Sequence, residues 1–400
     1  MKQLIYILTL CLAVILWQRC KEAGRLDHID NSIPAPGQIS NVKVVNTPGG
    51  AILTYKLPND PNLSYVKAIY EISPGNISES KASVYNDTLV VNGFGNTNTY
   101  TVKLFSVGLN EKVSEPLSVE VHPLTPPVVT AFKNLSIQAG FSGVKIRFQN
   151  ELLANLAIVL LADTSGDGYF TQLQTYYTKA PSGSFSYRGM APVKKTFKVY
   201  LRDRWNNKSD TLTSELTPLF EELVPKPFLS VNLPGDTNSP VAAGYNVEQM
   251  WNGILGTGIF ASPWTSKIPQ WFTFDLKQKV VISRLKEHQR ATNYTYTGSN
   301  VKSFELWGST NPDADGGWKN WSMLGTFKSL KPSGLPLGQM TAEDYAYGYT
   351  NGEDFELDSD VFPAAKQEVR YLRFKTTETY GGGVQVTICE ITFWGQINKN

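Results

Sequence analysis

Short runs in which apolar and polar residues alternate dominate the first half of the chain. The run VKAIYEI at 66–72 has an apolar residue at every second position, and the turn-forming cluster PNDPN at 58–62 precedes it. Runs of this length and period are typical of β-strands with one face in a core. The pattern predicts strands at 42–46, 51–58, 66–72, 88–94, 100–107 and 117–123, and then at 143–150, 156–163, 170–178, 183–189 and 197–207. Many short strands at this spacing indicate β-sandwiches.

Proline-rich segments divide this strand-rich region. PLTPPV at 123–128 cannot continue a central strand, because proline lacks the N–H that the strand ladder requires. The triplet LTP begins at Leu124 and again at Leu216, 92 residues later, which is about one sandwich domain. We therefore interpret the region as two related sandwiches in tandem. In its strand spacing and its proline-flanked ends, the run 38–124 resembles a fibronectin type III domain.

The pattern changes after VPKPF at 224–228. Aromatic residues cluster, glycines become frequent, and the segments between apolar runs lengthen. The runs QWFTFDL, FELWGST, VRYLRF and VTICEITFWG then follow in this order, and the last contains Glu390 and Gly395. These motifs, spread over residues 230–396, resemble the discoidin family, also called coagulation factor 5/8 type C. The resemblance implies a galactose-binding-like jelly roll.

The last apolar run, VQVTICEITFWG at 384–395, changes phase. Its apolar residues fall at even positions up to Ile388 and at odd positions from Cys389 onward. Such a slip predicts either a β-bulge or a strand buried on both faces. Cys389 has apolar neighbours and no histidine near it in the sequence, so we expect a buried, unreactive thiol.

The N-terminus contains one lysine followed by an almost wholly apolar run at 3–17. This run is short for a membrane span and is typical of a signal peptide. It leads to Cys20, and Lys21 and Glu22 follow. The arrangement resembles a bacterial lipoprotein signal with the surface-export signal of Bacteroides-type lipoproteins, which implies lipid attachment at Cys20. Arg19 departs from the small residue that such signals have, so a soluble secreted protein stays the alternative.

These patterns predict an all-β chain with two tandem fibronectin-like β-sandwiches followed by a discoidin-like jelly roll. The predicted segments are a signal peptide at 1–19, a tether at 20–37, a first sandwich at 38–124, a second sandwich at 125–226, and the discoidin-like domain, called the head below, at 227–400.

Removal of the signal peptide leaves a chain without net charge. The sequence has 37 Lys and Arg against 35 Asp and Glu, and Lys2 and Arg19 leave with the first 19 residues. Without a basic surplus we expect no binding to nucleic acid, and membrane contact only through the N-terminal lipid.

The sequence contains little that indicates catalysis. Only three histidines occur, and no nucleophile elbow, zinc motif or phosphate loop is present. A glycoside hydrolase would need two paired carboxylates, and the spacing of the acidic residues pairs none. We therefore expect no enzyme activity and no cofactor.

Two acidic loops imitate metal-binding motifs. DTSGDG, which begins at Asp163, matches the first six positions of a calcium-binding loop. At position twelve, however, the sequence has Gln174 instead of the bidentate glutamate. NPDADGGW at 311–318 also holds two carboxylates on a glycine-rich segment. We interpret both as turns and predict no metal site, with a structural calcium as the alternative. We expect Trp205, in RDRWNN, to pack rather than to bind ligand.

Aromatic and planar polar residues gather in three predicted loops of the head. FASPWTSK contains Trp264, the next loop contains Arg290, Asn293 and Tyr294, and TTETYGGG contains Tyr380. Sugar rings stack on Trp and Tyr, while planar polar groups bond their hydroxyls or carboxylates. The discoidin resemblance implies that ligands bind to loops at one end of the jelly roll. We expect these five side chains to converge there, with Tyr380 exposed before three glycines; packing within the loops is the alternative.

The whole arrangement resembles the accessory surface lipoproteins of Bacteroides-type glycan-uptake systems. The resemblance implies a non-catalytic, lipid-anchored, glycan-binding protein of the outer membrane and cell surface. Its partners would be a poly- or oligosaccharide and neighbouring outer-membrane uptake proteins, and the sandwiches would hold the head away from the membrane. A protein-binding or adhesive surface module is the alternative. Aromatic residues around a concave loop face would favour sugar, and a flat apolar patch would favour protein.

Overall fold

The computed structural model describes residues 32–256 and 258–398. The predicted signal peptide, Cys20 and most of the tether lie outside these residues. No helix within them is long and apolar enough to cross a membrane. The chain divides into two compact units. The first comprises the described residues up to 137 with 146–185 and 196–214, and the second comprises 138–145, 186–195 and the residues from 215 onward.

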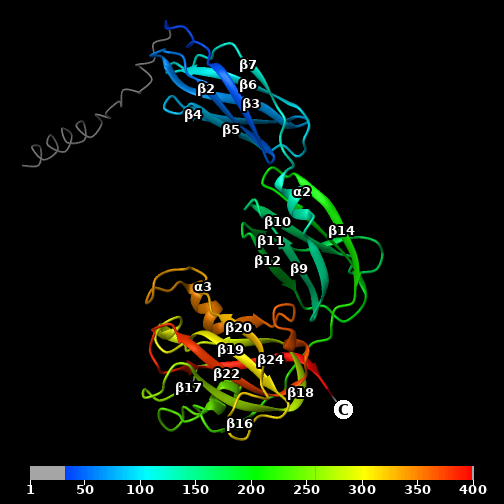
Figure 1. Ribbon diagram of the computed structural model, residues 1–400, viewed down its shortest axis with the longest axis vertical. Helices are drawn as coiled ribbons and strands as arrows, with labels where there is room; N and C mark the ends of the chain where they lie inside the picture. The colour runs from blue at the N-terminus through cyan, green and yellow to red at the C-terminus, as the bar shows by residue number, and fades with distance from the viewer. Residues whose placement is uncertain (1–31, 257, 399–400) are drawn as a thin grey trace, which may run out of the picture. The chain divides into compact units, whose positions relative to one another are not determined.

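The first sandwich consists of two antiparallel sheets, coloured blue to cyan in Figure 1. One sheet has the order β1-β2-β5 and the other β4-β3-β6-β7. The strands are β1 (Ser40–Thr47), β2 (Gly50–Lys56), β3 (Leu63–Ser73), β4 (Asn76–Ser83), β5 (Thr88–Asn92), β6 (Tyr100–Gly108) and β7 (Leu117–Val121). Alternate residues face inward, so Leu53, Val66, Val91 and Leu104 are fully buried between the sheets. The alternation seen at 66–72 is therefore the core face of β3.

The second sandwich begins with a helix that the sequence did not predict. α2 (Pro127–Phe132) follows the proline-rich boundary, and proline suits its first turn because the N–H there has no helical partner. The sheets have the orders β11-β10-β13-β14 and β12-β9-β8. The strands are β8 (Ser136–Gly140), β9 (Gly143–Gln149), β10 (Leu156–Ala162), β11 (Thr171–Thr178), β12 (Ser182–Tyr187), β13 (Lys195–Arg202) and β14 (Lys208–Leu216). Almost every residue of β10 is buried, which explains its unbroken apolar sequence.

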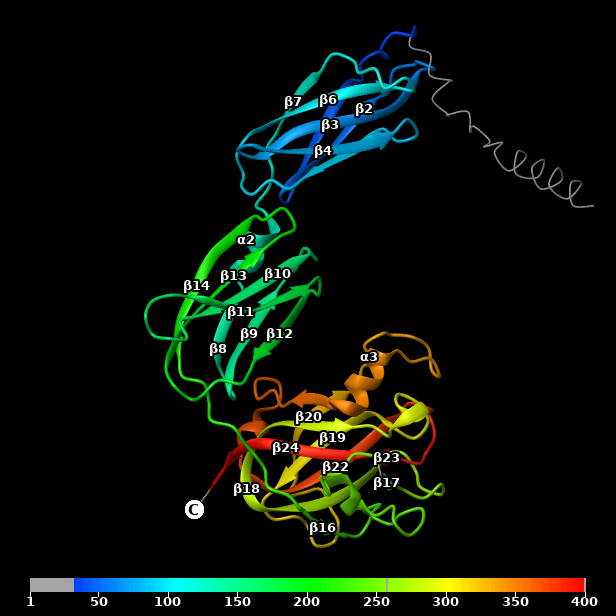
Figure 2. The same ribbon diagram turned by 180° about the vertical axis from the view of Figure 1, so that it is seen from behind.

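The head is a jelly roll whose main sheet has the order β15-β24-β18-β22-β19-β20, with β16 and β21 also paired to β18. A two-stranded sheet, β17-β23, accompanies it (Figure 2). The strands are β15 (Glu222–Leu223), β16 (Leu229–Val231), β17 (Phe260–Ala261), β18 (Gln270–His288), β19 (Val301–Ser309), β20 (Ser322–Lys328), β21 (Glu353–Glu356), β22 (Val369–Thr379), β23 (Thr387–Ile388) and β24 (Glu390–Ile397). The short helices are η2 (Val247–Trp251), η3 (Thr292–Tyr294), α3 (Ala342–Tyr345), η4 (Ala346–Thr350) and η5 (Pro363–Lys366). The predicted all-β class is confirmed.

Strand β18 joins two parts of the jelly roll. Its first half pairs with β16 and β22, and its second half pairs with β21 and β24. The register with β22 shifts between Asp275 and Val280, where Lys277 has a φ of 65°. The Asp275 carboxylate accepts the Lys277 N–H at 2.7 Å and forms a bidentate ion pair with Arg370. These bonds hold the irregular backbone where the strand changes its partners.

The closing stretch forms two strands instead of one. β23 pairs with β17, and after Cys389 the chain continues as β24, which pairs with β18 and β15. Every residue from 385 to 391 is buried, so burial on both faces, the second of the two predicted alternatives, is correct. The phase slip marks the residue at which the chain changes its partner strands. The Cys389 thiol is buried, as expected, and burial raises its pKa.

Candidate functional site

Three loop segments of the head surround a hollow of about 300 Å³, called the head hollow below. They are 262–269 after β17, 289–300 between β18 and β19, and 380–386 between β22 and β23. Figure 2 shows β17 and β23 next to each other, so segments far apart in the sequence reach one place. The residues that line the hollow are Trp264, Arg290, Tyr294, Thr297, Gly298, Ser299, Asn300, Gly381, Gly383, Gln385 and Thr387.

Hydrogen bonds connect the three segments. The Gln385 side chain donates to the carbonyl oxygen of Ser262 at 3.0 Å and accepts from the hydroxyl of Ser299 at 3.0 Å. The Gly381 N–H donates to the Gly298 carbonyl oxygen at 2.7 Å, and a Cβ at Gly381 would lie 2.9 Å from that oxygen. Glycine is therefore needed at this close approach. Gln385 was not among the predicted site residues, because its partners lie on loops that are distant along the chain.

Asn300 supports the segment 289–300 from beneath. Its side chain is buried, and its Oδ1 accepts the Arg290 N–H at 2.8 Å. Its Nδ2 donates to the carbonyl oxygens of Tyr294 and Thr297. These bonds satisfy backbone groups of the irregular loop. This role was not predicted, although an asparagine that follows a Gly-Ser pair just before a strand is a common turn-closing residue.

The exposed rings of the head hollow are Trp264 and Tyr294. The side chain of Trp264 is 69% exposed and that of Tyr294 is 49% exposed. The guanidinium carbon of Arg290 lies 3.8 Å from the centre of the Tyr294 ring, a close cation–π contact. Among the residues that the structure describes, none accepts a hydrogen bond from the Arg290 guanidinium or forms an ion pair with it. Its donors are therefore available to a ligand. The structure thus brings together three of the five predicted residues.

The other two predicted residues do not line the head hollow. Asn293 is exposed in the turn η3. Tyr380 is only partly exposed: its hydroxyl donates to the Ser329 carbonyl oxygen at 3.0 Å, and its ring meets that of Tyr296 edge to face at 5.3 Å. Tyr380 is therefore not the exposed ring that we expected before the three glycines, because its hydroxyl finds a backbone acceptor beneath the loops.

Two buried glutamates lie opposite each other, Glu287 on β18 and Glu353 on β21. Glu353 accepts hydrogen bonds from the Leu330 N–H at 3.0 Å and the Ser329 hydroxyl at 2.5 Å. In the described part of the chain, Oε1 of Glu287 has no hydrogen-bond partner. Burial raises the pKa of Glu353 to about 7. Burial, together with the neighbouring Glu353, raises the pKa of Glu287 well above its usual range. Both shifts favour the protonated, uncharged forms of the two carboxyl groups.

The lining of the head hollow contains no carboxylate among the described residues. Glycoside hydrolysis needs two carboxyl groups beside the scissile bond, and the two buried glutamates are closed off from solvent. In the same part of the chain, no group of three or more His, Cys, Asp or Glu residues could hold a metal ion. The head hollow offers stacking surfaces and hydrogen-bond donors, which suit binding.

The remaining sequence motifs have structural roles. The Asp163 carboxylate accepts hydrogen bonds from three backbone N–H groups of its own loop, and the Asp313 carboxylate holds Asn320. These bonds close each acidic loop on itself, as in a turn, and the absence of a metal from both loops stays a prediction. Trp205 packs against the hydrophobic core of the first sandwich, as expected.

Comparison with known proteins gives three family matches and several similar structures. The family models match residues 36–123, 124–227 and 248–395, and each is described as a domain of unknown function (DUF4959, DUF5126 and DUF5000, in this order). A SusE-like protein of solved structure is 30% identical, with 68% of this chain and 100% of that protein covered and a TM-score of 0.44. No curated protein sequence matches the chain.

Two further solved structures are more distant. The C-terminal domain of a chitobiase from Bacteroides fragilis is 14% identical, with 43% of this chain and 95% of that chain covered and a TM-score of 0.30. A CBM32 module bound to GalNAc is 12% identical, with 43% of this chain and 100% of that chain covered and a TM-score of 0.28. Likenesses at this level support no argument about ligands.

The fold and the head hollow define an all-β protein with a hollow lined by loops. The chain belongs to the family of SusE-like proteins, because the 30% identity extends over the whole of that relative. This assignment rests on sequence identity and not on the superposition of the structures.

Proposed function

We propose that the protein is a non-catalytic, glycan-binding accessory protein of the cell surface that captures polysaccharide for uptake. The observation that carries the proposal is the exposed ring of Trp264 in one hollow with the stacked pair of Arg290 and Tyr294. Membership in the SusE-like family supports the accessory role.

Trp264 provides the stacking surface of the proposed site. Because its side chain is mostly exposed, a sugar ring placed on the indole would cover apolar surface that otherwise contacts water. Tyr294 offers a second, smaller surface, and the cation–π contact with Arg290 restricts both side chains. A restricted site loses less side-chain entropy when a ligand binds.

Arg290 provides directional hydrogen bonds. Its planar guanidinium can donate two parallel bonds to a pair of sugar hydroxyls or to a sugar carboxylate. Among the described residues, it is the only charged one that lines the head hollow. The site therefore suits neutral sugars or a sugar with a single carboxylate.

The size of the head hollow limits the ligand. Its volume of about 300 Å³ is at the lower end of the range of about 300–1,000 Å³ for ligand pockets. A segment of one or two sugar rings fits this size, and the concave shape favours sugar over the flat protein-binding patch of the alternative. We expect a modest affinity, roughly micromolar to millimolar, with little dependence on salt.

A glycan-array screen of residues 20–400, followed by calorimetry on variants, tests the proposal. Trp264→Ala and Tyr294→Ala should each weaken binding by about 1–3 kcal/mol, because each removes an aromatic contact. Tyr371→Ala is the matched control: Tyr371 also lies beside an arginine, Arg370, but near the opposite end of β22 from the loop 380–386. Its substitution should leave affinity unchanged.

Two results would contradict this assignment. If glycan affinity is unchanged in both Trp264→Ala and Tyr294→Ala, the binding site lies on another face of the protein. If no glycan binds, but a protein ligand binds and Trp264→Ala abolishes that binding, the adhesive alternative would be favoured.

We further propose that Cys20 carries a lipid anchor, that the two sandwiches act as spacers, and that neighbouring outer-membrane uptake proteins are partners. Cys20→Ala should move the protein from the outer-membrane fraction to the soluble fraction, whereas Cys11→Ala, inside the signal peptide, should not. If the wild-type protein is recovered in the soluble fraction and is cleaved at another residue, lipidation at Cys20 would be excluded.

A further inference from the structure

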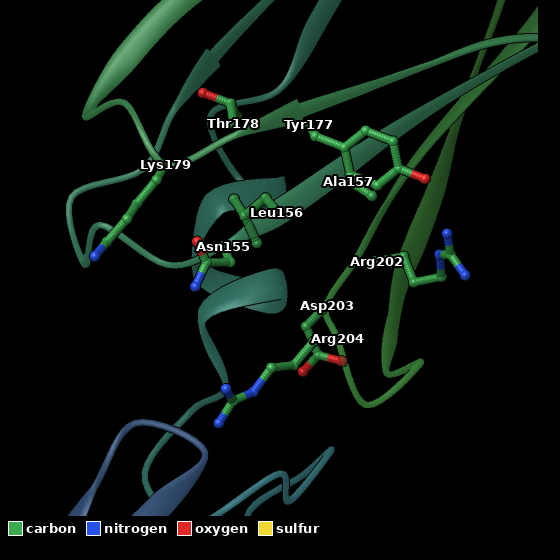
Figure 3. A pocket seen from close by; sticks show the side chains of 9 residues that line it. All are labelled: Asn155, Leu156, Ala157, Tyr177, Thr178, Lys179, Arg202, Asp203 and Arg204. Atoms are coloured by element: carbon green, nitrogen blue, oxygen red, sulfur yellow. The ribbon is translucent and has the colours of Figure 1, made fainter. Parts of the chain in front are cut away.

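A second hollow, of about 530 Å³, lies on the second sandwich and has a basic lining; we call it the basic hollow. Lys179 follows β11, Arg202 ends β13, and Arg204 lies in the turn after β13. These strands lie on the two sides of β10, so the sheet brings the three cations to one place. Figure 3 shows Lys179 and Arg204 on one side of the basic hollow and Arg202 on the other.

In the described part of the chain, the three cations of the basic hollow have no ion-pair partner, although the Asp203 carboxylate lies in the same lining. The one carboxylate in the lining, that of Asp203, already accepts bonds of 2.9 Å from the backbone of Trp205 and from the backbone and side chain of Asn207. Cations without ion-pair partners attract anions, so an anionic ligand in the basic hollow would gain favourable electrostatic interactions.

The basic hollow also contains a stacking surface and an amide. Tyr177 is 75% exposed. Asn155, which precedes β10, adds a planar amide with both donors and an acceptor. The guanidinium of Arg204 lies 4.1 Å from the ring centre of Trp205, which itself packs on a core, so Arg204 is held in place.

We propose that the basic hollow binds an acidic oligosaccharide. Carboxylate or sulfate groups pair with Lys179, Arg202 and Arg204, and a sugar ring lies on Tyr177. Guanidinium groups bind these anions bidentately, and an aromatic plane selects for a ring-shaped ligand. The concave shape suits a short saccharide better than a flat bilayer, and the neutral mature chain does not favour nucleic acid. This site is independent of the head hollow and would extend the proposed function to saccharides that carry several acidic groups.

Calorimetry on residues 20–400 tests the proposal with three probes: trigalacturonate for carboxylates, a chondroitin sulfate tetrasaccharide for sulfates, and neutral maltotriose. At least one acidic probe should bind, and binding should weaken when NaCl rises from about 0.05 M to about 0.5 M, because salt screens the ion pairs. The triple variant K179Q/R202Q/R204Q should lose at least about tenfold in affinity for that probe, since charge-assisted hydrogen bonds are removed. The result with maltotriose should be the same for the triple variant as for the wild-type chain.

Two matched controls distinguish the basic hollow from the rest of the protein surface. Lys208→Gln removes one positive charge from β14 of the same sandwich, where Lys208 lies over Tyr200 outside the basic hollow, and affinity should persist. Trp264→Ala alters only the head hollow, and the acidic probe should still bind. Thermal melting of each variant verifies that it is folded.

Four results would overturn the proposal. The first is that neither acidic probe binds the wild-type chain, and the second is that Trp264→Ala abolishes binding of the acidic probe while the triple variant does not. The third is that Lys208→Gln loses as much affinity for the acidic probe as the triple variant does. The fourth is that neither oligosaccharide binds, but the wild-type chain binds phosphatidylserine vesicles and the triple variant does not. The last result would identify the basic hollow as a lipid-binding surface.

Discussion

Tyr294 and Tyr380 are both loop tyrosines of the head, but their surroundings differ. Tyr294 is half-exposed beside Arg290, whereas the hydroxyl of Tyr380 bonds to Ser329, which is 51 residues away in the chain. Both lie in polar, turn-rich sequence, so their neighbours in the chain do not distinguish a ligand-contacting ring from a supporting one. The difference arises from the acceptor that the fold places within reach of one hydroxyl.

This contrast predicts different effects when each hydroxyl is removed. Tyr380→Phe should lower the free energy of unfolding of the head by about 1 kcal/mol, because a partly buried hydrogen bond is lost. Tyr294→Phe should leave it unchanged, since no described residue bonds to that hydroxyl. Urea unfolding measures both. A loss of glycan affinity in Tyr380→Phe without loss of stability would instead mean that Tyr380 contacts the ligand.

The buried Glu353 predicts a pH dependence of stability. Its pKa is about 7 in the folded head and near the usual 4.5 in the unfolded chain, so between these values the folded state holds a proton that the unfolded state releases. Stability should therefore fall as pH rises from about 4.5 to about 7, by an amount on the order of 3 kcal/mol. Glu353→Gln should reduce this slope in urea unfolding, and the slope that remains should come from Glu287, whose pKa is also raised by burial.

Glu343→Gln is the matched control for this titration, because Glu343 is exposed in α3. Its substitution should preserve the pH slope. An equal slope in Glu353→Gln and in the unmodified protein would show that Glu353 does not titrate in this range.

At the scale of elements, the walls of the head hollow are loops. Side-chain amides provide the hydrogen bonds to the loop backbone that a neighbouring strand would provide in a sheet. Gln385 bridges two loops, 262–269 and 289–300, and Asn300 bonds to the backbone of the second of them. Buried amides of this kind are costly to remove, because their backbone partners are left without hydrogen bonds.

Asn300→Ala tests this support. We expect the free energy of unfolding of the head to fall by about 1–3 kcal/mol, because the Arg290 N–H and two loop carbonyls lose their partner. Amide hydrogen exchange should accelerate across 289–299, and glycan affinity should fall with it. Asn293→Ala, in the same loop but exposed, should change none of these three quantities. Normal exchange protection in Asn300→Ala would mean that the loop is held by other contacts.

At the scale of the whole molecule, three independently folding domains with joints near 125 and 226 stay a prediction. The structure adds one fact about the second joint: β15 pairs with β24, and Val224 is fully buried in the core of the head. The segment just before residue 226 therefore belongs to the sheet of the head.

Limited proteolysis should cut near residue 125 and near the second joint and leave a stable head fragment. A fragment of residues 215–400 should be more stable than one of residues 227–400 by about 1.5–3 kcal/mol, because the shorter one lacks the buried Val224. Thermal melting of both fragments measures the difference. If the whole chain unfolds in one cooperative step and no head fragment survives, the domain prediction is wrong.

Local pattern was sufficient to predict most strands of the two sandwiches and the all-β class, because a period of two and the turn preferences of Gly, Pro, Asn and Asp act over a few residues. It missed β4, β8 and β14. The order of the motifs in the head was sufficient to predict its jelly-roll fold. The phase slip at Cys389 predicted two alternatives, and the packing of β23 and β24 selected one.

The sites depended on contacts that are distant in the chain. The sequence indicated the region of the head hollow and three of its residues, but Gln385 meets Ser262 across 123 residues. The basic hollow was not predicted at all, because Lys179 and Arg202 come together only when β11 and β13 both pair with β10. Strand order and register decide which loops and side chains meet, and they arise from long-range hydrogen bonding and core packing that no local pattern encodes.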